Sequence, residues 1–468
     1  MADVIIIGGG ITGLCSGMLL ARDGHRVRIL DRDPAPPPAG PDDRWSDWER
    51  RGVTQFRQLH GFLPRFRQLL DAELPEVVPA LIADGALHGN RITALPDTLT
   101  GGWRTGDERF AHVTGRRPVV EGTIARLASQ EPGLEIRRGV AVRGLLTGTP
   151  ARADVPHVAG VVTAGGDEMY ADLVVDAGGR RSPAPGWLVE LGSRPPVEHM
   201  DDDGFVYYSR HFRSPDGSVP VSKAPPVQPY ETLTIVTLPA DNGTWGVAIV
   251  ASAADKAMRE ARRSDVFDRV LRSYPLVAHW LDGEPLTDVE VFARIEDRQR
   301  QYWFDDQPVV TGLLAVGDAW ACTNPSLGRG ASIGLRHAVA LRDVLAEATP
   351  RSPVELVERF AIETAVTVEP LFHDAVAFSR HRLAEIDAQI AGRPYETDDM
   401  GWKLGQALRY ASTRDPDLLR AFISITTLLE RGVDVFRQPG VAEKAVALGS
   451  PSPAPGPGRA ELLELLAA

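Results

Sequence analysis

The first thirty residues alternate between hydrophobic runs and glycine-rich turns, a pattern that predicts a strand, a helix and a second strand. Residues 4–7 are an uninterrupted aliphatic run, which is typical of a strand buried on both faces at the centre of a parallel sheet. Residues 11–23 place apolar side chains at helical spacing and end before Gly24. Residues 25–30 predict the second strand, which ends at Asp31. The pattern therefore predicts one strand–helix–strand unit.

The turn after the first strand carries three glycines in the spacing GxGxxG. In a dinucleotide site these glycines form the tight turn, let the backbone approach a pyrophosphate and bring helix and strand close together. The pyrophosphate lies on the helix N-terminus, and Asp31 is placed to accept hydrogen bonds from the adenosine ribose. We therefore predict a site for NAD(P) or FAD; the alternative is an empty unit whose glycines serve packing alone. The candidate residues are Gly8, Gly10, Ile11, Thr12, Gly13, Asp31 and Arg32.

A second hydrophobic run with a glycine-rich turn occurs near residue 317. Residues 313–316 predict another buried strand, and residues 332–346 predict a helix. Between them lies the segment GDAWACTNPSLGRG. This segment resembles the GD motif of flavoprotein monooxygenases of the aromatic-hydroxylase type, a pattern written roughly as GDAAHxxxPxxGxGxNxG. Taken with the first motif, the resemblance favours FAD over NAD(P).

The resemblance implies a cofactor-binding role for individual residues of this segment. Its aspartate would bind the ribityl chain, its proline would shape the loop beside the flavin ring, and the next glycines would let the backbone approach that ring. N–H groups at the following helix start would face the flavin edge where negative charge grows on reduction. The residues concerned are Gly317 and Asp318, then Pro325, then Gly328 and Gly330, and finally Ala331 and Ser332.

Three further fragments match patterns of the same family. Residues 114–127 predict a helix, and Arg117 at its start matches an arginine that faces the FAD phosphate or ribityl chain. Residues 136–145 predict a strand, in which Val142 matches a backbone contact to adenine. Residues 48–77 resemble a segment of an epoxidase-like branch; an amphipathic helix whose arginines face water explains them equally well. On the first interpretation, the flavin pocket is lined by Arg50, Arg51, Arg57, Gln58 and His60.

The third family fingerprint, usually written GADGxxSxxR, is altered in residues 172–188. When the segment is aligned on Ser182, Gly178 replaces the aspartate and Pro185 replaces the arginine. The variant resembles the VDATGRxSRxP form of bacterial squalene-epoxidase-like and polyether-epoxidase-like FAD-dependent oxidoreductases. Because the missing pair is tied to NAD(P)H handling in the aromatic hydroxylases, a separate flavin reductase becomes an alternative source of electrons.

The pattern changes again beyond residue 200. Residues 205–212, 232–238 and 244–250 alternate as strands do, which predicts an antiparallel sheet with one face packed and one open. In the family the substrate domain lies here, although core packing explains each of its aromatic residues better than substrate contact does. The chain beyond residue 351 is mostly helical and ends in a Pro-rich spacer and a short helix, which would dock on a partner subunit or fray. The substrate-lining candidates are Tyr207, Tyr208 and Trp245.

These segments define an α/β fold class with a discontinuous Rossmann-type FAD-binding domain. The expected FAD-binding parts are residues 1–190, with a small inserted segment at about 75–112, and residues 292–350. An antiparallel β-sheet substrate domain, residues 191–291, is inserted between them, and a helical region, residues 351–468, follows.

Composition and charge narrow the class of protein. The chain has 468 residues, 43% hydrophobic and 24% charged, which is ordinary for a folded protein of several domains. Its 63 acidic and 51 basic residues give a net charge of −12, which repels nucleic acids and anionic membranes. Cys15 and Cys322 provide neither a disulfide framework nor zinc-ligand spacing, so no metal is expected. Without a basic signal segment or a membrane-length apolar run, we expect a soluble, cytoplasmic protein.

Together the motifs predict an FAD-dependent monooxygenase. The resemblance implies that one oxygen atom from O2 enters an apolar or aromatic small molecule, by hydroxylation or epoxidation, through a flavin hydroperoxide, and it points to secondary metabolism. The chemistry is then flavin-centred, with no dedicated catalytic side chain expected. NADH or NADPH would supply the electrons, directly or through a flavin reductase.

Three alternatives remain at this point. A geranylgeranyl-reductase-like enzyme would reduce a double bond. A flavin-dependent halogenase would need a catalytic lysine early in the chain, whereas the first lysine here is Lys223. A non-catalytic FAD-binding protein would share the motifs without the reaction.

Overall fold

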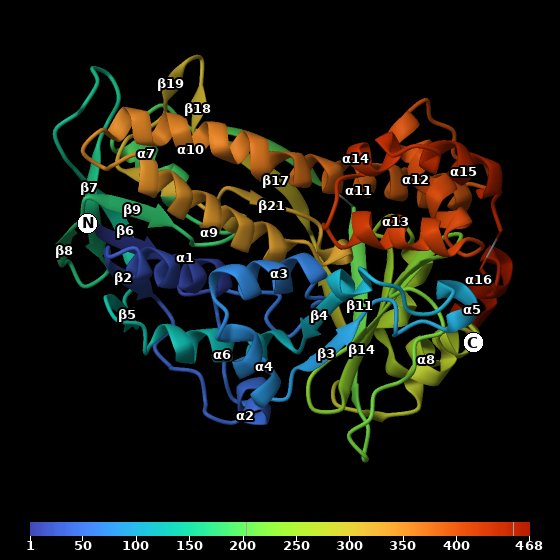
Figure 1. Cartoon of the computed structure of the whole chain (residues 1–468). Coiled ribbons are helices and arrows are strands. Elements are labelled where there is room, and N and C mark those ends of the chain that lie inside the picture. The colour runs from blue at the N-terminus through green and yellow to red at the C-terminus, as the bar shows by residue number, and fades with distance from the viewer. Residues whose placement is uncertain (203, 453) are drawn as a thin grey trace.

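The computed structural model describes residues 1–202, 204–452 and 454–468. Its parallel sheet consists of β1 (Asp3–Ile7), β2 (Arg26–Asp31), β5 (Leu134–Arg138), β9 (Leu173–Asp176) and β20 (Leu313–Ala315). β1 lies at the centre, as its aliphatic run predicts, between β2 and β9 (Figure 1). The sheet thus brings widely separated stretches of chain together, which confirms the α/β fold class.

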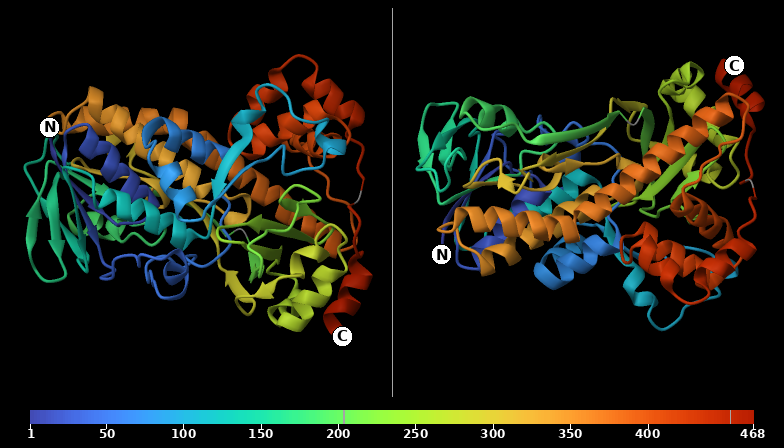
Figure 2. Two further views of the ribbon diagram at one scale, coloured as in Figure 1. Left: turned by 60° about the horizontal axis from the view of Figure 1, so that its bottom comes forward. Right: turned by 90° about the horizontal axis from the view of Figure 1, so that it is seen from above.

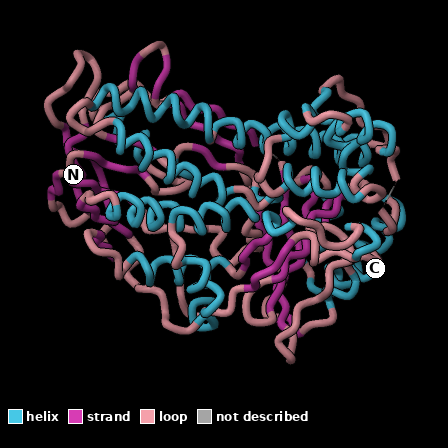
Figure 3. Tube along the Cα trace, in the orientation of Figure 1, coloured by secondary structure: helices cyan, strands magenta, loops and turns pink. Residues whose placement is uncertain are grey.

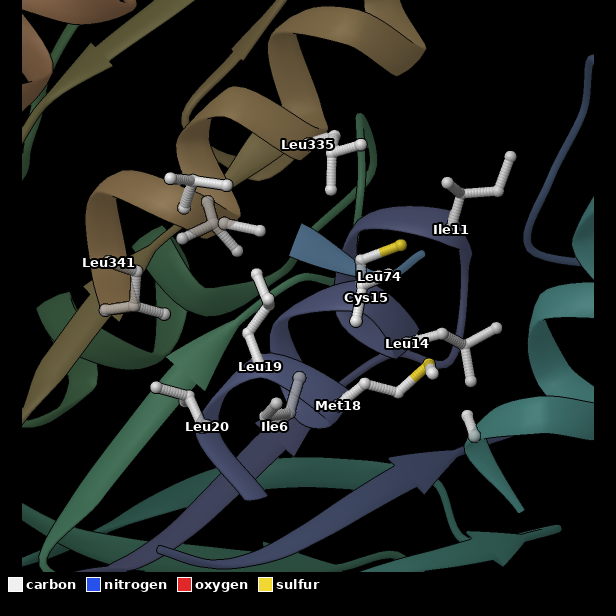
Figure 4. Packing of buried hydrophobic residues seen from close by; sticks show 14 of the residues in the cluster. Ile6, Ile11, Leu14, Cys15, Met18, Leu19, Leu20, Leu74, Leu335 and Leu341 are labelled. Carbon is white, nitrogen blue, oxygen red and sulfur yellow. The ribbon is translucent and has the colours of Figure 1, made fainter. Parts of the chain in front are cut away.

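Both faces of this sheet are covered, and this explains why β1 is aliphatic throughout. Helices cover one face, namely α1 (Ile11–Arg22), α6 (Arg117–Ala128) and α9 (Gly330–Glu347). Val4 and Ile6 pack against these helices, and Figure 4 shows the buried side chains of α1 beside those of α9. Ile5 and Ile7 pack on the other face, which is covered by the antiparallel strands β6 (Val142–Thr147), β7 (Val158–Thr163) and β8 (Glu168–Tyr170).

The single strand expected at residues 136–145 is wrong, because the chain forms β5 and β6 in two different sheets. Gly139 adopts φ +73° between them, a left-handed conformation that suits glycine. The backbone then turns toward the end of β2, where the Val140 N–H donates to the Asp31 carbonyl at 2.9 Å. Val142 instead pairs with Thr163 of β7.

A second, antiparallel sheet contains the three strands expected from the alternating pattern. They are β11 (Phe205–Arg213), β13 (Leu233–Pro239) and β14 (Thr244–Ser252), extended by β12 (Val227–Pro229), β15 (Glu284–Pro285) and β16 (Glu290–Ala293). The expectation of an open face is wrong: every residue of β14 is buried. Helices α8 (Ser264–Arg272) and α16 (Arg459–Ala467) cover one face, and α11 (Glu369–Ile390) packs on the other (Figure 2).

Smaller elements join the two sheets. A hairpin of β3 (Leu87–Asn90) and β4 (Ala111–Thr114) and a three-stranded sheet of β10 (Val197–Asp202), β17 (Glu296–Gln301) and β21 (Ala321–Cys322) lie between them. Further helices are α2 (Pro41–Ser46), α3 (Pro64–Glu73), α4 (Val77–Ala83), α5 (Asp97–Thr100), α7 (Ala184–Glu190) and α10 (Pro353–Thr367). Across the residues described, every helix is too short or too polar to cross a membrane.

The C-terminal helices form a cap above the second sheet, seen at the upper right of Figure 3. The cap comprises α12 (Met400–Ala411), α13 (Pro416–Thr426), α14 (Gly432–Arg437) and α15 (Val441–Leu448). Leu419 and Ile423 of α13 pack on Ile92 and Phe110 of the segment between β3 and β4. Arg420 of α13 also bonds the buried Asp107, with 2.6 Å between Nη2 and Oδ2. The cap is therefore attached to the N-terminal half of the chain.

The last helix docks on its own chain, which corrects the expectation of a frayed or partner-bound tail. Leu462 and Leu466 of α16 are buried in the core beneath α8. Arg459 forms an ion pair with Asp255. The expected Pro-rich spacer precedes this helix, and its Pro453 lies outside the described residues.

Candidate functional site

The glycine-rich loop after β1 combines tight packing with one open position. A Cβ added to Gly13 would lie 2.0 Å from the Gly8 carbonyl oxygen, and one added to Gly8, at φ +104°, would lie 2.6 Å from the Ala177 oxygen. A Cβ on Gly10 would instead meet none of the described atoms within 4 Å, apart from its chain neighbours. This space lies at the N-terminus of α1, where free N–H groups and the helix dipole favour an anion. The loop therefore fits a pyrophosphate.

The second motif lies directly against this loop. Thr12 of α1 fills the space beside Gly317 and Gly334, because Cβ atoms there would be 3.0 and 2.3 Å from the Thr12 hydroxyl oxygen. The Gly317 N–H donates to Nδ1 of the buried His337 at 3.2 Å. Burial lowers the pKa of His337 to about 3, so the ring is the neutral acceptor that this bond requires. The structure thus brings the two glycine motifs together, as a common cofactor site requires.

The predicted ribose ligand, Asp31, belongs to a buried cluster of charges centred on Arg50. Arg50 lies 2.8 Å from Asp31, 2.9 Å from Asp33 and 3.1 Å from Glu121, and it donates to the Gly9 carbonyl at 3.1 Å. Burial raises the pKa of Asp31, and the Arg50 charge opposes that shift. Arg50 therefore holds three carboxylates beneath the glycine loop.

The cluster still leaves polar atoms that a cofactor could satisfy. The Asp31 Oδ1 atom accepts the Asp33 N–H at 3.0 Å, but Oδ2 accepts no well-directed hydrogen bond although Arg50 lies within ion-pair distance. The Arg138 Nη1 atom and the Ser332 hydroxyl are also buried without a partner among the described residues. Since orphaned buried groups are costly, these atoms fit a polar ligand in this region.

Arg117 connects the charge cluster with the second motif. Its Nε donates to Glu121 at 3.0 Å and its Nη1 lies 3.4 Å from Nε2 of His60. Asp318, in a 3-10 turn after β20, has its pKa raised by burial, while the charges of Arg117, Arg180 and Arg298 lower it. Burial together with Arg117 lowers the pKa of His60 to about 3, so His60 is neutral.

Sequence reasoning missed Asp33, Glu121, Arg138 and Arg180. Glu121 carried a detectable signal, because it stands four residues after Arg117 in a predicted helix and so shares its face. Arg180 follows the end of β9, the edge of a parallel sheet where ligands bind. Asp33 and Arg138 offer no comparable signal.

In the third motif, Asp176 serves the fold. Its Oδ1 accepts the Gly178 N–H at 2.9 Å, and its Oδ2 accepts the Ser182 hydroxyl at 2.5 Å. Ser182 in turn accepts the Ala184 N–H at 3.2 Å at the start of α7. These bonds fix the turn that carries Arg180.

The loop before α9, which is the second half of the GD motif, borders a large cavity. Gly328 has φ +64°, and a Cβ there would lie 3.0 Å from the Gly61 carbonyl oxygen. The preceding Asn324 donates its N–H to Asp297 at 2.6 Å and accepts the Tyr207 hydroxyl. Beyond the loop lies a cavity of about 1010 Å³ between the second sheet and the helical cap, lined mainly by apolar side chains. Its volume is at the upper end of the usual range for ligand pockets.

Only one of the three predicted substrate-lining residues reaches this cavity. Tyr207 lines it, together with Gln58 and His60. Tyr208 and Trp245 lie on the opposite face of the sheet, in the core beneath α8, and the Trp245 indole donates to the Trp280 carbonyl at 2.8 Å. Successive residues of a strand point to opposite faces, so Tyr207 and Tyr208 cannot share a role.

Other predicted residues lie away from the glycine motifs and the cavity. Arg57 donates to the carbonyl groups of Trp45 and Ser46, both at 3.0 Å. Arg32 and Arg51 are exposed. The amphipathic-helix interpretation of residues 48–77 accounts for α3, whose buried side chains include Phe66 and Leu70. Arg50 and His60, just before this helix, are buried or partly buried beside the candidate site.

The fold and this geometry resemble those of FAD-dependent oxidoreductases. Residues 3–40 match the model of the family described as FAD dependent oxidoreductase, DAO. The match covers β1, α1 and β2, including the open loop and Asp31.

Individual proteins resemble the chain over most of its length. Protein Rv3254 of Mycobacterium tuberculosis is 28% identical over 393 residues, which cover 79% of this chain and 78% of that protein. PqsL, a probable FAD-dependent monooxygenase from Pseudomonas aeruginosa, has a similar structure with a TM-score of 0.56 and 15% identity, covering 83% of this chain and 99% of its own. The structure of CmlS, a flavin-dependent halogenase, is similar with a TM-score of 0.58 and 16% identity, and the match covers 88% of this chain and 72% of CmlS. At such identities the structural likeness concerns the fold.

Proposed function

We propose that the protein is an FAD-dependent monooxygenase acting on a predominantly apolar small molecule. The observation that carries the proposal is the junction of two glycine motifs at an open helix N-terminus, next to a large cavity of mainly apolar lining. FAD would be held by residues of both motifs and of α6. They are Gly8, Gly10, Ile11, Thr12, Gly13, Asp31, Arg117, Gly317, Asp318, Pro325, Gly328, Gly330, Ala331 and Ser332.

Bound FAD supplies the redox and oxygen chemistry, and the chain supplies binding, orientation and exclusion of water. The N–H groups at the start of α9 would stabilise negative charge on a flavin bound there. Apolar side chains such as Leu59, Leu238 and Leu327 keep the cavity dry. His60, held neutral by burial, adds no competing charge there.

Oxygenation is favoured over halogenation by the cavity itself. No lysine is among the described residues that line it, whereas the early catalytic lysine of the halogenases would have to reach the substrate. Reduction of a double bond remains the second candidate, because a dry apolar cavity serves it equally. The altered third motif, with Gly178 and Pro185, supports electron supply by a separate flavin reductase.

The cofactor proposal is tested with Gly10→Val. Because a Cβ at this position meets open space, we expect the variant to fold normally and to lose bound FAD, since its side chain occupies the pyrophosphate position. Gly144→Val, at another open glycine in β6, is the matched control and should retain FAD. Absorbance of bound flavin and thermal unfolding give the two readouts. Retention of FAD by folded Gly10→Val would remove the loop from the site.

The reaction is tested on the FAD-loaded protein. Anaerobic mixing with NADH or NADPH shows by loss of flavin absorbance whether reduction is direct. Chemically reduced protein is then mixed with 18O2 and polycyclic aromatic or terpenoid acids and alcohols, and the products are analysed by mass spectrometry. We expect one 18O atom in the product. A product with two added hydrogens and no 18O would identify the double-bond reductase instead.

A further inference from the structure

The charged side chains in the cavity wall differ in sign from the protein as a whole. The chain carries a net charge of −12. Among the described residues, the cavity is lined by six arginines and three carboxylates. Most of these charges are paired or lie at the rim, as for Arg382, which donates to the Tyr230 and Leu233 carbonyls at 2.6 and 2.8 Å. The excess of positive charge is therefore meaningful only where an arginine lacks a partner.

Arg91 and Arg329 are such arginines, and the more buried of the two is Arg329. It stands between Gly328 and Gly330 in the loop beside the predicted flavin ring, and only 6% of its surface is exposed. Its Nε and Nη1 atoms are buried, and the guanidinium forms no hydrogen bond or ion pair with the described residues. Asp374 of α11 lines the same cavity, and its charge favours the charged form of Arg329, but its ion-pair partner is Arg431, at 3.6 Å.

A buried cation without a partner is expensive for the fold. Burial lowers the pKa of Arg329 to about 10, so the group remains charged at neutral pH. Moving an unpaired charge out of water costs several kcal/mol, and native proteins normally compensate this with a counter-charge. The charge of Asp374 acts on Arg329 only from beyond ion-pair distance, so an anionic ligand in contact with the guanidinium would complete the compensation.

We propose that Arg329 binds the anionic group of the substrate, which is therefore a large apolar acid, such as a carboxylate, with its charged end beside the flavin loop. This inference rests on the proposed function for its substrate. The guanidinium faces a cavity whose other walls belong to the second sheet and the helical cap, so an acid held there extends its apolar part between Leu238 and Phe422. Arginine suits this role because its planar fork matches a carboxylate.

The test compares two probes that differ only in charge at one end, 1-pyrenebutyrate and 1-pyrenebutanol. Their dissociation constants are measured by equilibrium dialysis against the full-length protein, both loaded with FAD and without added FAD. We expect the acid to bind at least about tenfold more tightly than the alcohol, the usual gain from a charge-assisted hydrogen bond. Arg329→Gln should remove this preference and leave alcohol binding unchanged, and Arg329→Lys should restore part of it.

Arg437→Gln is the matched control, since Arg437 lines the same cavity with 76% of its side chain exposed. It should change either dissociation constant by no more than about twofold.

Three outcomes would each overturn the proposal: equal binding of the two probes by the parent protein, no binding of the acid, or an unchanged preference in Arg329→Gln. Bound FAD is measured in every variant. If Arg329→Gln loses FAD but keeps the preference, Arg329 serves the cofactor, and this inference is wrong while the proposed function stands. If the parent protein never binds FAD but prefers the acid, the proposed function fails and this inference survives.

Discussion

Two buried arginines stand at the two ends of the candidate flavin site, and their surroundings are opposite. Arg50, 7% exposed, is surrounded by Asp31, Asp33 and Glu121 beneath the glycine loop. Arg329, 6% exposed, has no partner among the described residues. Equal burial thus accompanies three ion pairs for Arg50 and none for Arg329 among the described residues, where only the more distant charge of Asp374 acts. A charge that the chain itself neutralises holds the fold together, whereas a charge left unneutralised is available to a ligand.

The largest effect is expected from Arg50→Met, which removes the only cation in ion-pair contact with Asp31 and Asp33 among the described residues. Breaking a buried ion pair by removing one partner costs about 3–5 kcal/mol, and we expect a loss of that size in the free energy of unfolding at pH 7. Urea denaturation measures it.

The pH dependence of Arg50→Met provides a second check. Burial raises the pKa of Asp31 even with Arg50 present, and without Arg50 the pKa rises further. A folded-state pKa above the unfolded value means that stability is lost as pH rises, so the defect should shrink toward pH 4. Arg51→Met, at an exposed neighbour, should be nearly neutral. A defect in Arg50→Met that stays constant from pH 4 to pH 8 would contradict the role of the cluster.

A smaller effect of opposite sign is expected from Asp297→Asn in β17. Asp297 has no ion-pair partner among the described residues, and burial raises its pKa to about 6. The folded protein therefore holds this proton to higher pH than the unfolded chain, and stability falls as pH rises from about 4 to above 6. The amide should gain up to about 3 kcal/mol at pH 8 and nothing at pH 4. The amide oxygen can still accept the Asn324 N–H. The difference between the free energies of unfolding measured at pH 8 and pH 4 therefore reports the effect of the charge alone.

The part of the candidate site that would hold the dinucleotide could be predicted from patterns of neighbouring residues in the sequence. The glycine spacing, the buried strand and the helix boundary each depend on a few adjacent residues, and β1, α1 and β2 form where the pattern predicts them. The proximity of Gly317 and Thr12 could also be predicted, because both motifs follow strands of one parallel sheet.

The cavity beside this part of the site could not be predicted in the same way. It is formed by packing between segments far apart in the sequence, and the spacing of residues along the chain does not determine that packing. The alternation of β11 separates Tyr207 from Tyr208, but it does not say which face meets the cavity. That choice is made by α16 and α11, which cover the two faces from far along the chain. Likewise, the sequence GRG does not predict that Arg329 lacks an ion-pair partner, because the charge that acts on it, Asp374, belongs to the distant helix α11.

The smallest change in stability, and the sharpest contrast with Arg50→Met, is expected from Arg329→Met. An apolar side chain of similar length removes an uncompensated buried charge, so the free energy of unfolding without ligand should rise by about 1–2 kcal/mol. Urea denaturation at pH 7 measures it, beside Arg437→Met as the exposed control. A loss of stability comparable with that of Arg50→Met would show that Arg329 is neutralised within the folded chain. A gain would mean that the chain keeps Arg329 charged at the expense of its own stability, as expected of a residue that binds a ligand.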